Sequence, residues 1–104
     1  MADLSERIEE LLAAANRDLM NAVGDSSLCA VSRSGDRVDG VKYLEGRASA
    51  LRELRRKVGD EGAAAVDSVA AEWQRQLDRV QERDMGPDWL AYRAGGVDVL
   101  AELR

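Results

Sequence analysis

The chain is 104 residues long and carries 15 basic and 20 acidic side chains, for a formal net charge of −5, with no His and a single Cys. These counts exclude a disulfide framework, which needs paired cysteines, and they remove the usual ligands of a zinc site. They also exclude Ser-His-Asp and Cys-His catalysis, because the histidine base is missing. The length is that of one folded unit, so we expect a single helical domain over 1–104.

The apolar residues are mainly Ala, Leu and Val, and the aromatic residues are two Trp and two Tyr. This composition favours helices, because sheets are enriched in β-branched and aromatic residues. No apolar run reaches the ~18–20 residues that span a bilayer, and residues 1–6 do not resemble the start of a signal peptide. An unpaired Cys is typical of a reducing compartment. We therefore expect a cytoplasmic protein with no membrane partner.

The first predicted helix covers about 3–23. Asp3 followed by Glu6 is a capping box, and both carboxylates lie at the positive end of the helix dipole. Apolar residues then recur at spacings of three and four and form one stripe, which comprises Leu4, Ile8, Leu11, Leu12, Ala15, Leu19, Ala22 and Val23. Gly24 and the polar residues that follow it are expected to end the helix.

Residues 24–40 are the irregular part of the sequence. A short apolar run, Leu28 to Val31, is followed by a turn composition over 32–36. Two structures fit this pattern: a small β-hairpin with Gly35 in its turn, or a longer loop whose apolar residues insert into the bundle. The loop is favoured, because an isolated two-stranded ribbon is only marginally stable.

Three more helices are predicted after this segment. The first covers about 41–58 and is expected to end at Gly59, with Asp60 capping the next helix almost at once. That helix ends near Asp84, and Pro87 then occupies the first position of a helix that runs to the C-terminus. The prediction is an all-α protein, a four-helix bundle made of two helical hairpins, with the loop or small β-hairpin at about 24–40.

An internal repeat is the most informative feature of the sequence. The pattern Tyr43-x-x-Gly46-x-x-x-Ala50-Leu51-x-Glu53-Leu54-Arg55 recurs 49 residues later as Tyr92-x-x-Gly95-x-x-x-Val99-Leu100-x-Glu102-Leu103-Arg104. The charged ends of the pattern are common in amphipathic helices, but the two tyrosines are the only ones in the chain. Coincidence is one explanation. The favoured one is a duplicated helical hairpin, in which helices one and two correspond to helices three and four.

The tyrosine and the glycine of each repeat share one helix face. A glycine removes side-chain bulk, so another backbone can approach closely, and a neighbouring tyrosine ring can flank the contact. We therefore predict that the second and fourth helices cross near Gly46 and Gly95, beside Tyr43 and Tyr92, about a pseudo-twofold axis. The same crossing could instead form between two subunits.

Charge is unevenly distributed along the chain. Residues 40–58 hold six basic and two acidic side chains, whereas both flanking segments are net acidic. The candidate contact face on this second helix comprises Arg47, Arg52, Arg55, Arg56 and Lys57. Its last three members are expected in the final helical turn, where cations complement the dipole. The favoured interpretation is pairing with acidic neighbouring helices, and the alternative is contact with an acidic partner or with nucleic-acid phosphates.

No catalytic motif, phosphate-binding loop or metal-ligand pattern is present. We therefore expect a non-enzymatic protein without cofactor or metal: a small cytoplasmic protein–protein interaction or regulatory module that self-associates. The alternative is a nucleic-acid-binding regulator that uses the basic face of 42–57, which is not favoured because the acidic remainder would repel nucleic acid. A third hypothesis is a small apolar ligand between the hairpins near Trp73 and Trp89, although we expect both to be core anchors.

Overall fold

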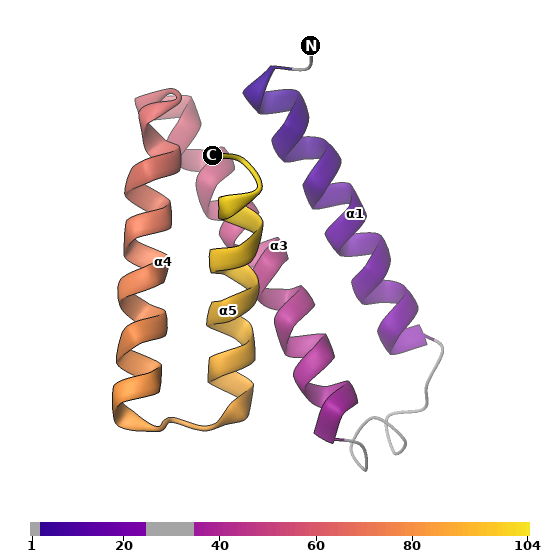
Figure 1. Cartoon of the computed structure of the whole chain (residues 1–104). Helices are drawn as coiled ribbons and strands as arrows, with labels where there is room; N and C mark the ends of the chain where they lie inside the picture. Colours follow the sequence, from indigo (N-terminus) through magenta and orange to yellow (C-terminus); the bar gives the residue numbers. More distant parts are fainter. Residues whose placement is uncertain (1–2, 25–34) are drawn as a thin grey trace.

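The computed structural model describes residues 3–24 and 35–104, and within them the chain forms four helices and no strand. The helices are α1 (Leu4–Gly24), α3 (Gly35–Glu61), α4 (Ala64–Arg83) and α5 (Pro87–Ala101). They run in alternating directions, with α3 and α5 in the middle, α1 beside α3 and α4 beside α5 (Figure 1). The predicted all-α bundle is confirmed. The predicted loop or hairpin falls largely on 25–34, which lie outside the described residues.

The N-terminal helix begins as the sequence predicts. The Asp3 carboxylate accepts a hydrogen bond from the backbone N–H of Glu6 at 2.8 Å, which satisfies one of the free donors at the helix start. Ile8, Leu12 and Ala15 from the predicted apolar stripe are buried in the core. The amphipathic pattern therefore identified the face of α1 that packs against α3.

The predicted bounds of the second helix were wrong at both ends. α3 begins at Gly35, so this glycine does not lie in a hairpin turn, and the acidic Asp36 directly after it is a residue type that favours a helix start. The helix also continues through Gly59 to Glu61. The chain turns at Gly62, whose φ of +68° is readily adopted only by glycine.

The connection between α4 and α5 uses two residues with positive φ. Asp84 ends α4 in the left-handed conformation, with φ of 50°, and Gly86 has φ of 106°. Pro87 then occupies the first turn of α5, as predicted, because its missing N–H and fixed φ suit that position. The short connection holds α4 and α5 antiparallel.

The core lies between the two central helices and the inner faces of α1 and α4. Its largest fully buried side chains are Ile8, Leu51, Leu54, Val99 and Leu100. Trp73 of α4 is also buried and joins this cluster. Among the residues that the structure describes, no helix is long and apolar enough to cross a membrane.

The most extensive contact between helices is the crossing of α3 and α5. A Cβ atom added to Gly46 would collide with the backbone carbonyl oxygen of Tyr92, and one added to Gly95 would collide with the carbonyl oxygen of Tyr43. The two contacts are reciprocal, and both glycines are buried. The predicted crossing partners therefore meet within one chain, backbone against backbone.

The two glycines at the end of α3 provide a first test. Gly62→Ala should lower the free energy of unfolding by about 1 kcal/mol, because alanine disfavours positive φ. Gly59→Ala should raise it by about 0.5–1 kcal/mol, because Gly59 is helical and a Cβ there would meet no atom within 4 Å. Urea denaturation measures both. A stabilising effect of Gly62→Ala would contradict the assignment of the turn.

The helix crossing makes a second prediction. Gly46→Ala and Gly95→Ala should each lower the free energy of unfolding by at least about 3 kcal/mol, because the helices must move apart to admit a methyl group against backbone. The double variant should cost clearly less than the sum, since one separation relieves both collisions. Gly40→Ala in α3 is the control, because its Cβ would meet no atom within 4 Å. Additive losses in urea denaturation would argue against a shared contact.

Candidate interaction surface

The two halves of the chain make matching contacts at the crossing of α3 and α5. They also make matching ion pairs to the outer helices α1 and α4. Arg55 ends the first repeat and pairs with Glu9 of α1 at 3.3 Å; Arg104 ends the second and pairs with Asp67 of α4 at 3.4 Å. Matching Glu9 to Asp67 sets an offset of 58 residues between α1 and α4, against 49 between α3 and α5. Under this offset the buried residues of α1 correspond to buried residues of α4, namely Ile8 to Val66, Leu12 to Ala70 and Ala15 to Trp73.

The surroundings of Tyr43 are polar. Its hydroxyl donates a hydrogen bond to Asp98 at 2.6 Å, and the guanidinium of Arg47 lies 5.9 Å from its ring centroid. Burial, with the hydrogen bond and negative charge of Asp98, raises the pKa of Tyr43 above its usual value. Arg47 also bonds to Glu102 at 2.7 Å. Burial acts to lower the pKa of Arg47, but the hydrogen bonds and negative charge that Glu102 and Tyr43 offer together outweigh it, so the pKa of Arg47 is raised.

The surroundings of Tyr92, the equivalent residue of the second repeat, are aromatic. Its ring centroid lies 5.6 Å from that of Trp73 and 6.0 Å from that of Trp89, and the Trp89 contact is edge-to-face. The guanidinium of Arg93 lies over the rings of Trp73 and Tyr92, at 4.8 and 5.3 Å from their centroids. Trp73 also donates its indole N–H to Glu53 at 2.5 Å. The two repeats thus place different types of side chain around equivalent tyrosines.

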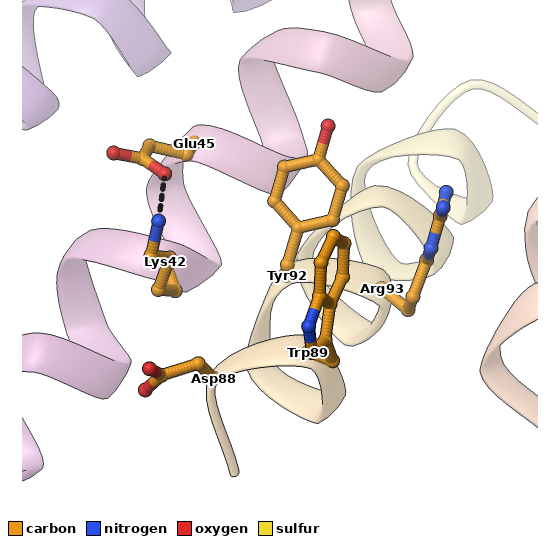
Figure 2. A pocket seen from close by; sticks show the side chains of 6 residues that line it. All are labelled: Lys42, Glu45, Asp88, Trp89, Tyr92 and Arg93. Atoms are coloured by element: carbon orange, nitrogen blue, oxygen red, sulfur yellow. Dashed lines mark hydrogen bonds and ion pairs between the residues drawn. The ribbon is translucent and has the colours of Figure 1, made fainter. Parts of the chain in front are cut away.

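A groove of about 480 Å³ lies beside Tyr92, between the N-terminal parts of α3 and α5. Its lining comprises Lys42, Glu45, Asp88, Trp89, Tyr92 and Arg93. Figure 2 shows the rings of Trp89 and Tyr92 standing between the Lys42–Glu45 ion pair on α3 and Arg93 on the other side. An aromatic floor with charges around it is the usual composition of a recognition surface.

Trp89 is the exposed member of this surface, with 49% of its area accessible. The expectation that both tryptophans are core anchors was therefore right for Trp73, which is 4% exposed, and wrong for Trp89. Of the four large exposed apolar side chains in the described part of the chain, Met85, Trp89 and Leu90 follow closely in sequence, and Met20 lies apart on α1. The residue equivalent to Trp89 in the first repeat is Gly40. Comparing the two repeats position by position could have identified this surface.

The five basic residues of the predicted contact face fall into two groups in the structure. Three bond to side chains of neighbouring helices, as Arg47 to Glu102, Arg52 to Asn16 and Arg55 to Glu9. Arg56 and Lys57 are exposed and form no ion pair with another described side chain. Because α3 continues to Glu61, neither cation lies in its last turn, contrary to the prediction. The basic residues therefore do not form one free face.

No protein-family model matches the chain, and no significant match was found among curated proteins or solved structures. Within 3–24 and 35–104, no cluster of three or more His, Cys, Asp or Glu side chains is placed to hold a metal ion.

The Tyr43 environment predicts a pH effect. In a Tyr92→Phe background the remaining tyrosine should titrate above pH 10, and Asp98→Asn should lower its pKa by removing the negative charge, while burial keeps part of the rise. Because the folded-state pKa is raised, this contribution to stability is complete below about pH 10 and is lost as the pH rises through the folded pKa. Ultraviolet absorbance titration measures the pKa, with Asp78→Asn on α4 as the control. An unchanged pKa in Asp98→Asn would contradict the assigned cause.

Proposed function

We propose that this chain is a small, non-enzymatic protein-interaction module of the cytoplasm that binds its partner through the surface around Trp89. The observation that carries the proposal is the exposure of Trp89 at a position where the other repeat has Gly40. A Cβ at Gly40 would meet no atom within 4 Å, so the fold requires no side chain there. The indole of Trp89 contacts Tyr92 on one side and keeps about half of its surface accessible.

The composition of the surface supports binding of another protein. Tryptophan is the residue type most enriched at the energetic centres of interfaces, where a few aromatic anchors carry most of the binding free energy. Trp89 contacts the ring of Tyr92 at the edge of the groove, so its indole is already partly ordered and loses less side-chain entropy on binding. Asp88 and Arg93 flank it on the same helix and can supply a polar rim.

In the sequence, the two glycines suggested a close helix contact that could form between subunits. In the structure this contact forms within one chain. Gly46 of α3 packs against the backbone of α5, and Gly95 of α5 packs against the backbone of α3, so neither glycine is available for a contact between subunits. A partner therefore has to bind elsewhere, and the groove beside Tyr92 offers an aromatic side chain, an opening and charges of both signs.

Nucleic-acid binding through the basic residues of α3 has weaker support. Phosphate contacts need cations that are free to reach the backbone of the nucleic acid. Three of the five candidates already bond to neighbouring helices, which leaves Arg56 and Lys57. Two cations on a chain of net charge −5 give little electrostatic affinity at physiological salt.

Site-specific photo-crosslinking tests the proposal. A benzophenone amino acid in place of Leu90, beside Trp89, should give a discrete crosslinked protein species in cells that produce the chain. The same amino acid in place of Met20, which is also exposed but lies on α1, should give none. Denaturing gel electrophoresis and mass spectrometry of the adduct measure the result.

A second substitution links the adduct to the anchor. Adding Trp89→Ala to the Leu90 probe should remove most of the adduct, because truncation of an interface tryptophan typically costs 2 kcal/mol or more of binding, about thirtyfold in Kd. Circular dichroism should show an unchanged helix content. Equal labelling from both probe positions, or no adduct from either, would contradict the proposed function.

A further inference from the structure

The aromatic rings of the groove separate its charged side chains into two groups. Arg93 lies on one side, where its guanidinium is 5.3 Å from the ring centroid of Tyr92. The Lys42–Glu45 ion pair and Asp88 lie on the other side (Figure 2). This second side therefore holds two carboxylates and one ammonium group, so negative charge is in excess there.

The excess negative charge belongs to Asp88. Lys42 pairs with Glu45 at 3.1 Å, and Asp88 forms no ion pair with another side chain in the described part of the chain. Asp88 is exposed in the first turn of α5, where its charge also complements the helix dipole. That long-range interaction leaves both carboxylate oxygens able to accept hydrogen bonds from a partner.

Trp89 and Tyr92 supply the aromatic walls of the groove. Their planes are inclined at 81° and their centroids are 6.0 Å apart, so the two rings form a corner. Aromatic faces attract cations, and this aromatic cluster already binds one, because Arg93 lies 4.8 Å from the ring centroid of Trp73. Trp89 is 49% exposed, which leaves indole surface for a second contact of the same kind.

A carboxylate beside exposed aromatic surface suits a cationic side chain. The stem and head group of an arginine or lysine can pack against the indole while its N–H groups donate to Asp88. An anionic side chain would meet the charge of Asp88, and an apolar one would desolvate this carboxylate without pairing it. The net charge of −5 on the whole chain adds a long-range attraction for a basic partner.

The size of the groove limits what can enter it. A volume of about 480 Å³ is typical of sites that hold small ligands, so the groove fits an inserted side chain better than a folded element of a partner. We propose that it binds a basic, extended segment of a partner protein, with an arginine or lysine side chain against Trp89 and paired with Asp88. This inference rests on the proposed function, because it names the chemistry of the partner for the same surface.

Selection from a displayed library of random peptides of about twelve residues tests the proposal. The library is selected against the full chain at about 0.15 M salt, where non-specific attraction to an acidic protein is largely screened. Peptides that also bind the Trp89→Ala variant are discarded. The remaining peptides should share an arginine or lysine at a common position. Acidic or wholly apolar sequences, or no Trp89-dependent peptide, would overturn the inference.

Fluorescence anisotropy of an enriched peptide measures the role of Asp88. Asp88→Asn should raise the Kd at least about tenfold, because a charge-assisted hydrogen bond is lost. Asp60→Asn is the matched control, since it removes the same charge about 27 Å along α3 from Lys42, and it should leave the Kd nearly unchanged. Thermal melting followed by circular dichroism verifies that both variants are folded. Equal effects of the two would show a response to net charge alone and would contradict the pairing.

Charge exchange identifies the contact itself. Replacing the common basic residue of the peptide with glutamate should abolish binding to the unmodified chain. Asp88→Lys should restore binding of this glutamate peptide, because the pair is re-formed with the charges exchanged. Failure of the rescue in a folded Asp88→Lys chain would place the cation elsewhere and overturn the inference.

The outcomes distinguish the basic segment from other occupants of the groove. If the Leu90 probe forms a Trp89-dependent adduct but the peptides lack a basic residue or ignore Asp88→Asn, the proposed function stands and the basic segment is wrong. If sedimentation velocity shows dimers of this chain that Trp89→Ala abolishes, a second copy occupies the groove and the basic segment is again wrong. If neither an adduct nor a peptide is found, both proposals fail.

Discussion

The fold depends on one backbone contact, the crossing of α3 and α5 at Gly46 and Gly95. Each glycine faces the carbonyl oxygen of the tyrosine three residues before the other glycine, so a side chain at either position would push the same two helices apart. Helices packed through side chains usually lie 8–10 Å apart, and a glycine contact allows a closer approach. This approach places the tyrosines on opposite sides of the crossing, where each meets a different set of neighbours. The outer helices α1 and α4 then cover the central pair.

The two halves differ around this crossing in compensating ways. Under the 49-residue offset Arg47 corresponds to Gly96, and under the 58-residue offset Ala15 corresponds to Trp73. One half thus combines a small residue on its outer helix with a large one on its central helix, and the other half has the reverse. A Cβ at Gly96 would collide with the indole of Trp73, so the glycine is what admits that ring. The equivalent carboxylates Glu102 and Glu53 accept hydrogen bonds from Arg47 and Trp73, respectively.

The spacing of residues along the sequence predicts which helix positions meet. It does not predict the backbone conformation at a helix end or how deeply a side chain is buried. The tyrosines and glycines at a constant offset predict which residues meet, because both helices keep the same period through the crossing. The end of α3 could not be located, because Gly59 and Gly62 are equally suitable in sequence and only the second has positive φ. The match of α1 to α4 was missed because its offset differs from that of the central helices. Trp89 was misplaced because an apolar residue in a helical stripe gives no measure of how far the stripe extends beyond the core.

The half of the chain around Tyr92 exposes aromatic and charged side chains beside a groove. In the half around Tyr43 the polar side chains instead bond to other side chains of the same chain. Tyr43 and Arg47 bond to Asp98 and Glu102, so the polar groups on that side are satisfied internally. Beside Tyr92 the same space is filled by rings, and the charges of Asp88, Arg93, Lys42 and Glu45 remain around an open groove. Trp89 rests edge-on against Tyr92 and keeps about half of its surface accessible beside this groove, which makes it the side chain best placed there to contact a partner.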